Sequence, residues 1–152
     1  MIKNFSKPMA AIVLLCLHPF GIARAGISSE TACYVSSDGK PVRFEFHSYH
    51  DSGRKWSGGF VRYENSTESI PVIFISSKTA KNFGESVLEP SSKWLEISRG
   101  KISGEYVLMR EGARTGVSGY VATYRNYEKN KVLNFVLNPA AGFEAAGCKW
   151  VN

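Results

Sequence analysis

The chain has 152 residues, of which 43% are hydrophobic and 21% are charged. This is the balance of one globular domain, and it excludes a disordered or collagen-like chain. The 19 Lys and Arg residues exceed the 13 Asp and Glu residues, so the formal net charge is +6. The basic residues form no clustered stripe, and a dedicated nucleic-acid-binding protein is therefore not expected.

Residues 1–25 have the pattern of a secretory signal peptide. Two lysines precede an apolar run from Met9 to Leu17, and the small residues of Ala23-Arg24-Ala25 follow it. The run is shorter than the roughly 18 to 20 residues that span a bilayer, so a retained membrane anchor is not expected. We expect an exported, periplasmic protein, with secretion from the cell as the alternative.

Removal of residues 1–25 leaves a single β-rich exported domain of residues 26–152. No repeat, low-complexity tract or Pro/Ser-rich linker divides it. The removed segment holds three basic residues and no acidic one, so sixteen basic and thirteen acidic residues remain and the net charge falls to +3. No transmembrane segment is expected after the signal is removed.

The cysteine count agrees with export. Cys16 leaves with the signal, and Cys33 and Cys148 remain near the two ends of the domain. An even pair in an oxidising compartment predicts a disulfide. A redox or metal-binding pair needs the close spacing of a C-x-x-C motif, which the sequence lacks, so we interpret Cys33 and Cys148 as a structural bridge.

Short runs rich in Val, Ile, Phe and Tyr, separated by Gly, Asn, Asp and Ser, predict strands. The Gly58-Gly59 pair indicates a bulge or a close approach of another backbone. The run Ile70–Ile75 is apolar on both faces, which predicts a central strand that is covered on both sides. Pro71 is expected to place the start of this strand at an edge or bulge. These four runs are Thr31–Ser36, Pro41–Tyr49, Trp56–Tyr63 and Ile70–Ile75.

A longer polar connection, 77–93, follows and could hold a helical turn around Lys78 to Phe83; a second such turn is expected within Pro139 to Gly147. Consecutive strands with short turns predict an all-β, single-domain antiparallel meander of about eight strands. Gly104 and Gly119, inside predicted strands, favour a small barrel over a sandwich. The remaining predicted strands are Trp94–Ile97, Lys101–Met109, Thr115–Tyr124 and Val132–Leu137.

Residues that could support catalysis are few. His47, His50 and Asp51 could be imagined as metal ligands, but two imidazoles three residues apart on a strand point to opposite faces. The chain contains no H-E-x-x-H motif and no Gly-rich phosphate loop. We therefore predict no catalytic residue, metal or cofactor, while any role of the two histidines stays open.

The charge layout suggests one binding end. In an up-and-down meander alternate turns lie at opposite ends, and one end collects the whole +3 excess. Loops on a rigid scaffold commonly carry binding, so an anionic or polar partner is expected there. The candidate residues of this basic loop end are Arg54, Lys55, Lys78, Lys81, Arg110 and Arg114.

An aromatic cluster at the opposite end is the alternative binding site. Tyrosines beside arginine are typical interface anchors. Its residues are Tyr63, Tyr124, Arg125 and Tyr127.

Three function classes follow. The first is a small exported binding module, an inhibitor or immunity-type protein that acts on another envelope or extracellular protein. The alternative is a periplasmic carrier of a small or lipid-like anionic ligand, since a barrel of about eight strands can enclose one small molecule. Large inward residues such as Phe44, Phe46, Phe74 and Tyr106 predict a filled core instead. A hydrolase is the third class, and the oligomeric state stays open.

Overall fold

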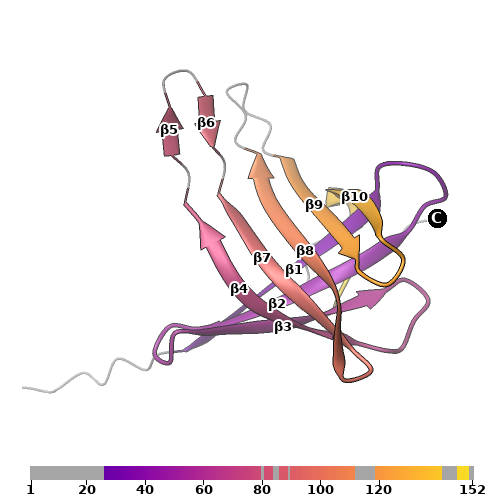
Figure 1. The fold of residues 1–152 in the computed structure, drawn as a ribbon, viewed down its shortest axis with the longest axis horizontal. Helices are drawn as coiled ribbons and strands as arrows, with labels where there is room; N and C mark the ends of the chain where they lie inside the picture. Colours follow the sequence, from indigo (N-terminus) through magenta and orange to yellow (C-terminus); the bar gives the residue numbers. More distant parts are fainter. Residues whose placement is uncertain are drawn as a thin grey trace, which may run out of the picture.

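Eight antiparallel strands close into a barrel (Figure 1). The computed structural model describes residues 26–79, 81–83, 86–88, 90–111, 119–141 and 147–150. Neighbours in the barrel follow the chain as a meander, and β1 closes the ring by pairing with β10. The predicted all-β meander is confirmed as a barrel. Its strands are β1 (Ile27–Ser36), β2 (Arg43–Asp51), β3 (Trp56–Tyr63), β4 (Ile70–Lys78), β7 (Ser91–Ser98), β8 (Lys101–Glu111), β9 (Gly119–Asn126) and β10 (Lys131–Leu137).

A two-stranded hairpin projects from the barrel where β4 ends and β7 begins (Figure 1). It consists of β5 (Lys81–Phe83) and β6 (Ser86–Leu88). The helical turn predicted around Lys78 to Phe83 is therefore wrong, because β4 continues to Lys78 and the next segment finds a strand partner.

The one helical element among the described residues is the short 3-10 helix η1 (Pro139–Ala141). It begins the second predicted helical turn, of which residues 142–146 lie outside the described residues. In the part of the chain that the structure describes, no helix has the length and hydropathy to cross a membrane.

Alternate residues of each strand fill the barrel with aromatic rings. Phe44 is at the centre of this core: its ring stacks on Tyr34 at 5.2 Å between centroids and meets Phe135 edge-on at 4.8 Å. Phe46 and Phe74 both pack against Trp94. The middle of the barrel is thus a filled core, as the large inward residues predict.

The barrel wall contains a close approach of two backbones, at Gly59, and a regularly paired proline, Pro71. A Cβ at Gly59 would lie 2.0 Å from the carbonyl oxygen of His47, which confirms a close backbone approach. Pro71 lies in regular register opposite Phe60, not at an edge or bulge. It is tolerated because the pairing of β4 with β7 begins one residue later, at Val72, so no ladder donor is missing on that side.

Candidate functional site

The predicted basic loop end is only partly described. Arg54 lies in the β2–β3 turn, where its guanidinium and backbone N–H both donate to the carboxylate of Asp51 at 3.0 Å. These hydrogen bonds hold the pKa of Asp51 below its ordinary value. Lys55 in the same turn and Lys78 at the end of β4 are exposed. The side chains of Lys81 and Arg110, and the whole of Arg114, lie outside the described residues.

The predicted aromatic cluster is split between two faces of the wall. Tyr63 and Tyr124 point into the barrel, whereas Arg125 is exposed on the outside. Tyr127 is 45% exposed and donates its hydroxyl to Glu105. Because successive strand residues alternate in direction, these four side chains do not form one surface.

The inward tyrosines belong to a network around the buried carboxylate of Glu96. Oε1 accepts hydrogen bonds from Ser103 at 2.7 Å and Tyr124 at 2.8 Å, and Oε2 accepts one from Tyr106 at 2.9 Å. Burial and the adjacent carboxylate raise the pKa of Tyr106 and Tyr124, so both remain donors. The network satisfies the carboxylate from three directions, which suits a structural role in fixing strand register.

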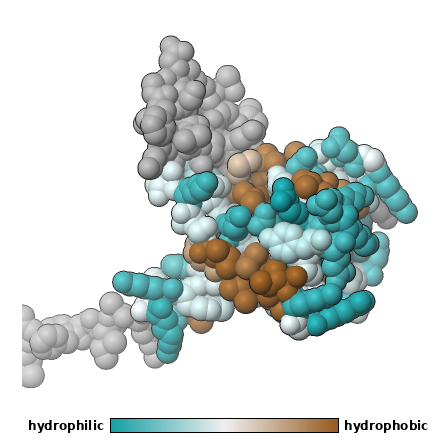
Figure 2. Space-filling view, in the orientation of Figure 1, coloured by the Kyte–Doolittle hydropathy of each residue, from teal (hydrophilic) through white to brown (hydrophobic). Residues whose placement is uncertain are grey.

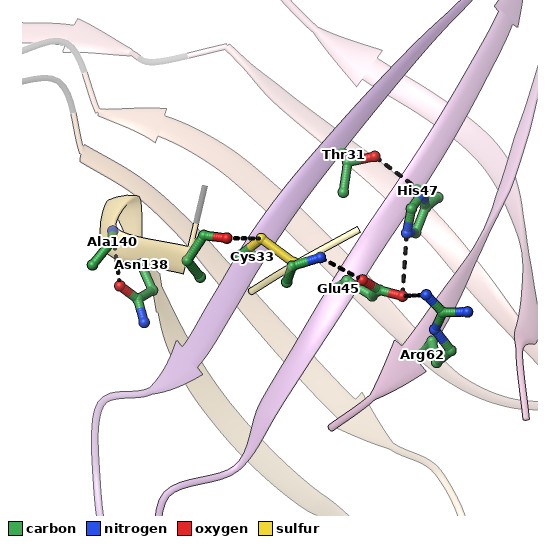
Figure 3. The surroundings of a disulfide bond; sticks show 9 residues. Thr31, Cys33, Glu45, His47, Arg62, Asn138 and Ala140 are labelled. Carbon is green, nitrogen blue, oxygen red and sulfur yellow. Dashed lines mark hydrogen bonds and ion pairs between the residues drawn. A yellow bond between two sulfur atoms is a disulfide. The ribbon is translucent and has the colours of Figure 1, made fainter. Parts of the chain in front are cut away.

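The two histidines have separate partners. On the outer wall, His47 contacts the Thr31 hydroxyl through Nδ1 at 3.0 Å and Glu45 through Nε2 at 3.3 Å (Figure 3). His50 is exposed and contacts the hydroxyl of Ser57. Among the described residues no three His, Cys, Asp or Glu side chains gather into a metal site.

The C-terminal segment covers the wall beside His47. Cys33 and Cys148 form the predicted disulfide, with their Cα atoms 5.8 Å apart (Figure 3). The backbone N–H of Cys148 donates to Glu45 Oε2 at 2.8 Å, and Arg62 forms an ion pair with the other oxygen of the same carboxylate. This part of the outer wall is thus closed by the chain itself.

The neighbouring part of the outer wall is apolar and uncovered. Trp56 is 53% exposed, and Ile73 and Ile75 are each 49% exposed. In the barrel register Gly58 lies opposite both Tyr49 and Ile73, and Ile73 lies opposite Leu95, so these side chains form one continuous surface. We name it the β3–β4 outer face, consisting of Tyr49, Trp56, Phe60, Pro71, Ile73, Ile75 and Leu95.

A shallow groove runs across this face. It has a volume of about 450 Å³ and is lined by residues of β2, β3 and β4. The Trp56 ring lies over Gly58, where an added Cβ would come within 2.4 Å of it. In the space-filling view, hydrophobic side chains gather over β3 and β4 in the middle of the molecule (Figure 2). Gly58 thus leaves room for the indole ring, which lines the groove together with Ile73.

Sequence reasoning did not identify this face, although its signal was present. The run Ile70–Ile75 was expected to be covered on both sides, and its inward residues Val72 and Phe74 do pack in the core. On the outer side, no described element covers Ile73 and Ile75. The expectation of a strand covered on both faces is therefore wrong for the described chain.

No family model, no curated protein and no solved structure matches this chain.

Proposed function

We propose that the protein is an exported binding module that docks another envelope protein on its β3–β4 outer face, as an inhibitor or immunity-type protein does. The observation that carries the proposal is that the exposed side chains of Trp56 and Ile73 line one groove on a strand pair whose inner side is already part of the core, with Ile75 also exposed two residues further along β4. Contiguous apolar patches on the surface of soluble proteins mark interaction sites.

The composition of the face favours a protein as the partner. Trp and Tyr are enriched among the residues that dominate binding energy, and Trp56 and Tyr49 border the groove together with Phe60. Aliphatic side chains such as Ile73 complete an apolar centre of the kind that protein interfaces bury.

The scaffold supports docking as a rigid body. A closed barrel with a disulfide holds the face in place before a partner arrives, so little conformational entropy is lost on binding. Lys55, next to Trp56, and Arg54 are exposed at one end of the face. An acidic rim on the partner would complement them, in agreement with the +3 charge expected of the exported chain.

Site-specific photocrosslinking in the native host tests the proposal. A photoreactive residue at Ile73 should give one dominant crosslinked protein, identified by mass spectrometry. The same residue at Val132, which is 48% exposed on the outer side of β10, is the matched control and should give none. Equal crosslinking from both positions, or none from Ile73, would contradict the proposal.

A further inference from the structure

A cavity of about 340 Å³, which we call the cup, lies at the barrel end where β4 leads into the β5–β6 hairpin. Ala32, Phe46 and Leu108 give it an apolar lower wall. Beneath them the rings of Phe46 and Trp94 meet edge-on at 5.2 Å, so the core closes the bottom of the cup. The cavity is separate from the β3–β4 outer face, because it lies inside the barrel.

Tyr34 supplies a polar group in this apolar setting. The residue is 2% exposed, no hydrogen bond among the described residues involves its hydroxyl, and this oxygen is not one of the fully buried polar atoms without a partner. Tyr34 lines the cavity together with Glu30 and Tyr120, and both of these add to the effect of burial in raising its pKa. The hydroxyl therefore stays protonated and is available as a donor.

The Tyr34 hydroxyl is therefore accessible from the cavity that Tyr34 lines, and it differs in this from the other buried tyrosines. Tyr106 and Tyr124, the other tyrosines buried to a similar degree, each donate to Glu96. Tyr63 shares a hydrogen bond with Tyr106 at 3.0 Å. Tyr34 differs from these three tyrosines because it lines the cavity and takes no part in the Glu96 network.

The rim of the cup is polar. It carries hydroxyls from Ser48 on β2, Ser77 on β4 and Ser92 on β7, and one charge of each sign from Glu30 and Lys78. An apolar lower wall under a polar rim is the usual arrangement of a small-molecule site, and barrel mouths are a frequent location for one.

We propose that this cup binds a small amphipathic molecule. The apolar body of the molecule lies against Phe46 and Leu108, and its polar group accepts a hydrogen bond from the Tyr34 hydroxyl. The cavity volume sets the size. An apolar cavity of about 150 Å³ accommodates benzene, so about 340 Å³ accommodates roughly a two-ring compound. This site does not depend on the proposed docking of a protein on the outer wall.

A matched pair of ligands tests the role of the hydroxyl. 2-Acetylnaphthalene carries a carbonyl acceptor, and 2-ethylnaphthalene has nearly the same shape without it. In NMR titrations of the oxidised chain from residue 26, both should shift the methyl signals of Ala32 and Leu108. The acetyl compound should bind about 3- to 10-fold more tightly, as expected for one added hydrogen bond.

Tyr34→Phe should remove this preference while leaving the affinity for 2-ethylnaphthalene unchanged. Tyr127→Phe, on the exposed surface, is the control and should retain the preference.

Ala32→Leu should weaken the binding of both ligands at least 10-fold by filling the cup. The proposal is overturned if neither compound shifts the two methyl signals, or if the acetyl preference is absent or survives in Tyr34→Phe. Ile73→Arg should leave both affinities unchanged, which separates this site from the outer face.

Discussion

The carboxylate of Glu96 and the hydroxyl of Tyr124 meet inside the barrel, 2.8 Å apart, although their strands are not neighbours. Glu96 belongs to β7 and Tyr124 to β9, and β8 lies between them. The hydrogen bond therefore joins two strands that backbone pairing does not connect. Gly104 on β8 makes this possible, because a Cβ there would lie 2.6 Å from the Tyr124 ring.

Removal of the Tyr124 hydroxyl should destabilise the fold, whereas removal of the Tyr34 hydroxyl should not. Tyr124→Phe leaves a buried carboxylate with one donor fewer, which costs about 1 to 3 kcal/mol. Tyr34→Phe removes a hydroxyl without a described protein partner and should leave the free energy of unfolding unchanged or higher. Urea unfolding of both variants measures the difference, and equal losses would refute this distinction.

The buried tyrosines should make the fold sensitive to alkali. Burial raises the pKa of Tyr63 to about 12 and raises the pKa values of Tyr34, Tyr106 and Tyr124 as well. A folded pKa above the unfolded value gives stability that is complete below about pH 10 and is lost as the pH rises through the folded value. Absorbance at 295 nm should therefore show these phenols ionising together with the loss of circular dichroism above pH 10. Their ionisation in the intact fold near pH 10 would contradict the burial.

The Cys33–Cys148 bridge should contribute a large part of the stability. It joins residues 115 positions apart, and the loop entropy removed from the unfolded chain corresponds to about 4 to 5 kcal/mol. Reduction should lower Tm by many degrees and also release the Cys148 N–H from Glu45. The Cys33→Ser/Cys148→Ser variant should show the same loss without reductant. Melting curves unaffected by reductant would argue against the bridge.

Asp51 should stabilise the β2–β3 turn at neutral pH and not in acid. Its folded pKa lies below the ordinary value because Arg54 donates two hydrogen bonds to it. The contribution is therefore complete above about pH 5 and is lost as the pH falls through the lowered pKa. Asp51→Asn should have a lower Tm than the parent at pH 7, and the gap should close by about pH 2. A gap that is constant across this range would contradict the ionic origin.

Much of the fold follows from local patterns in the sequence. The run Trp56–Tyr63 coincides with β3, and the cysteine pair forms the expected bridge. The connection after β4 was harder to predict, because the hairpin that replaces the expected helical turn depends on the pairing of Lys81–Phe83 with Ser86–Leu88. Short segments of this kind have no strong periodicity of their own.

The candidate site could be predicted only in part. The alternation of Trp94 and Glu96 places both side chains on one face, but the three hydroxyls around the carboxylate come from other strands. The run Ile70–Ile75 indicates that the outer side of this strand is apolar. Whether those outer side chains are exposed depends on which other parts of the chain pack over them. Cys148 holds the described residues 147–150 over Glu45, on the wall formed by β1 and β2, and no described residue covers Ile73.

Partner capture by two matched double variants tests the central claim most directly. Ile73→Arg/Ile75→Arg places charge on the β3–β4 outer face, and Val132→Arg/Val136→Arg places the same charge on β10, where the two valines are 48% and 44% exposed. Tagged chains from residue 26, matched for Tm, would be incubated with envelope extract. The account predicts that the parent and the β10 variant retain one partner protein and that the Ile73/Ile75 variant loses it at least 10-fold. Retention of that partner by the Ile73/Ile75 variant would contradict the account.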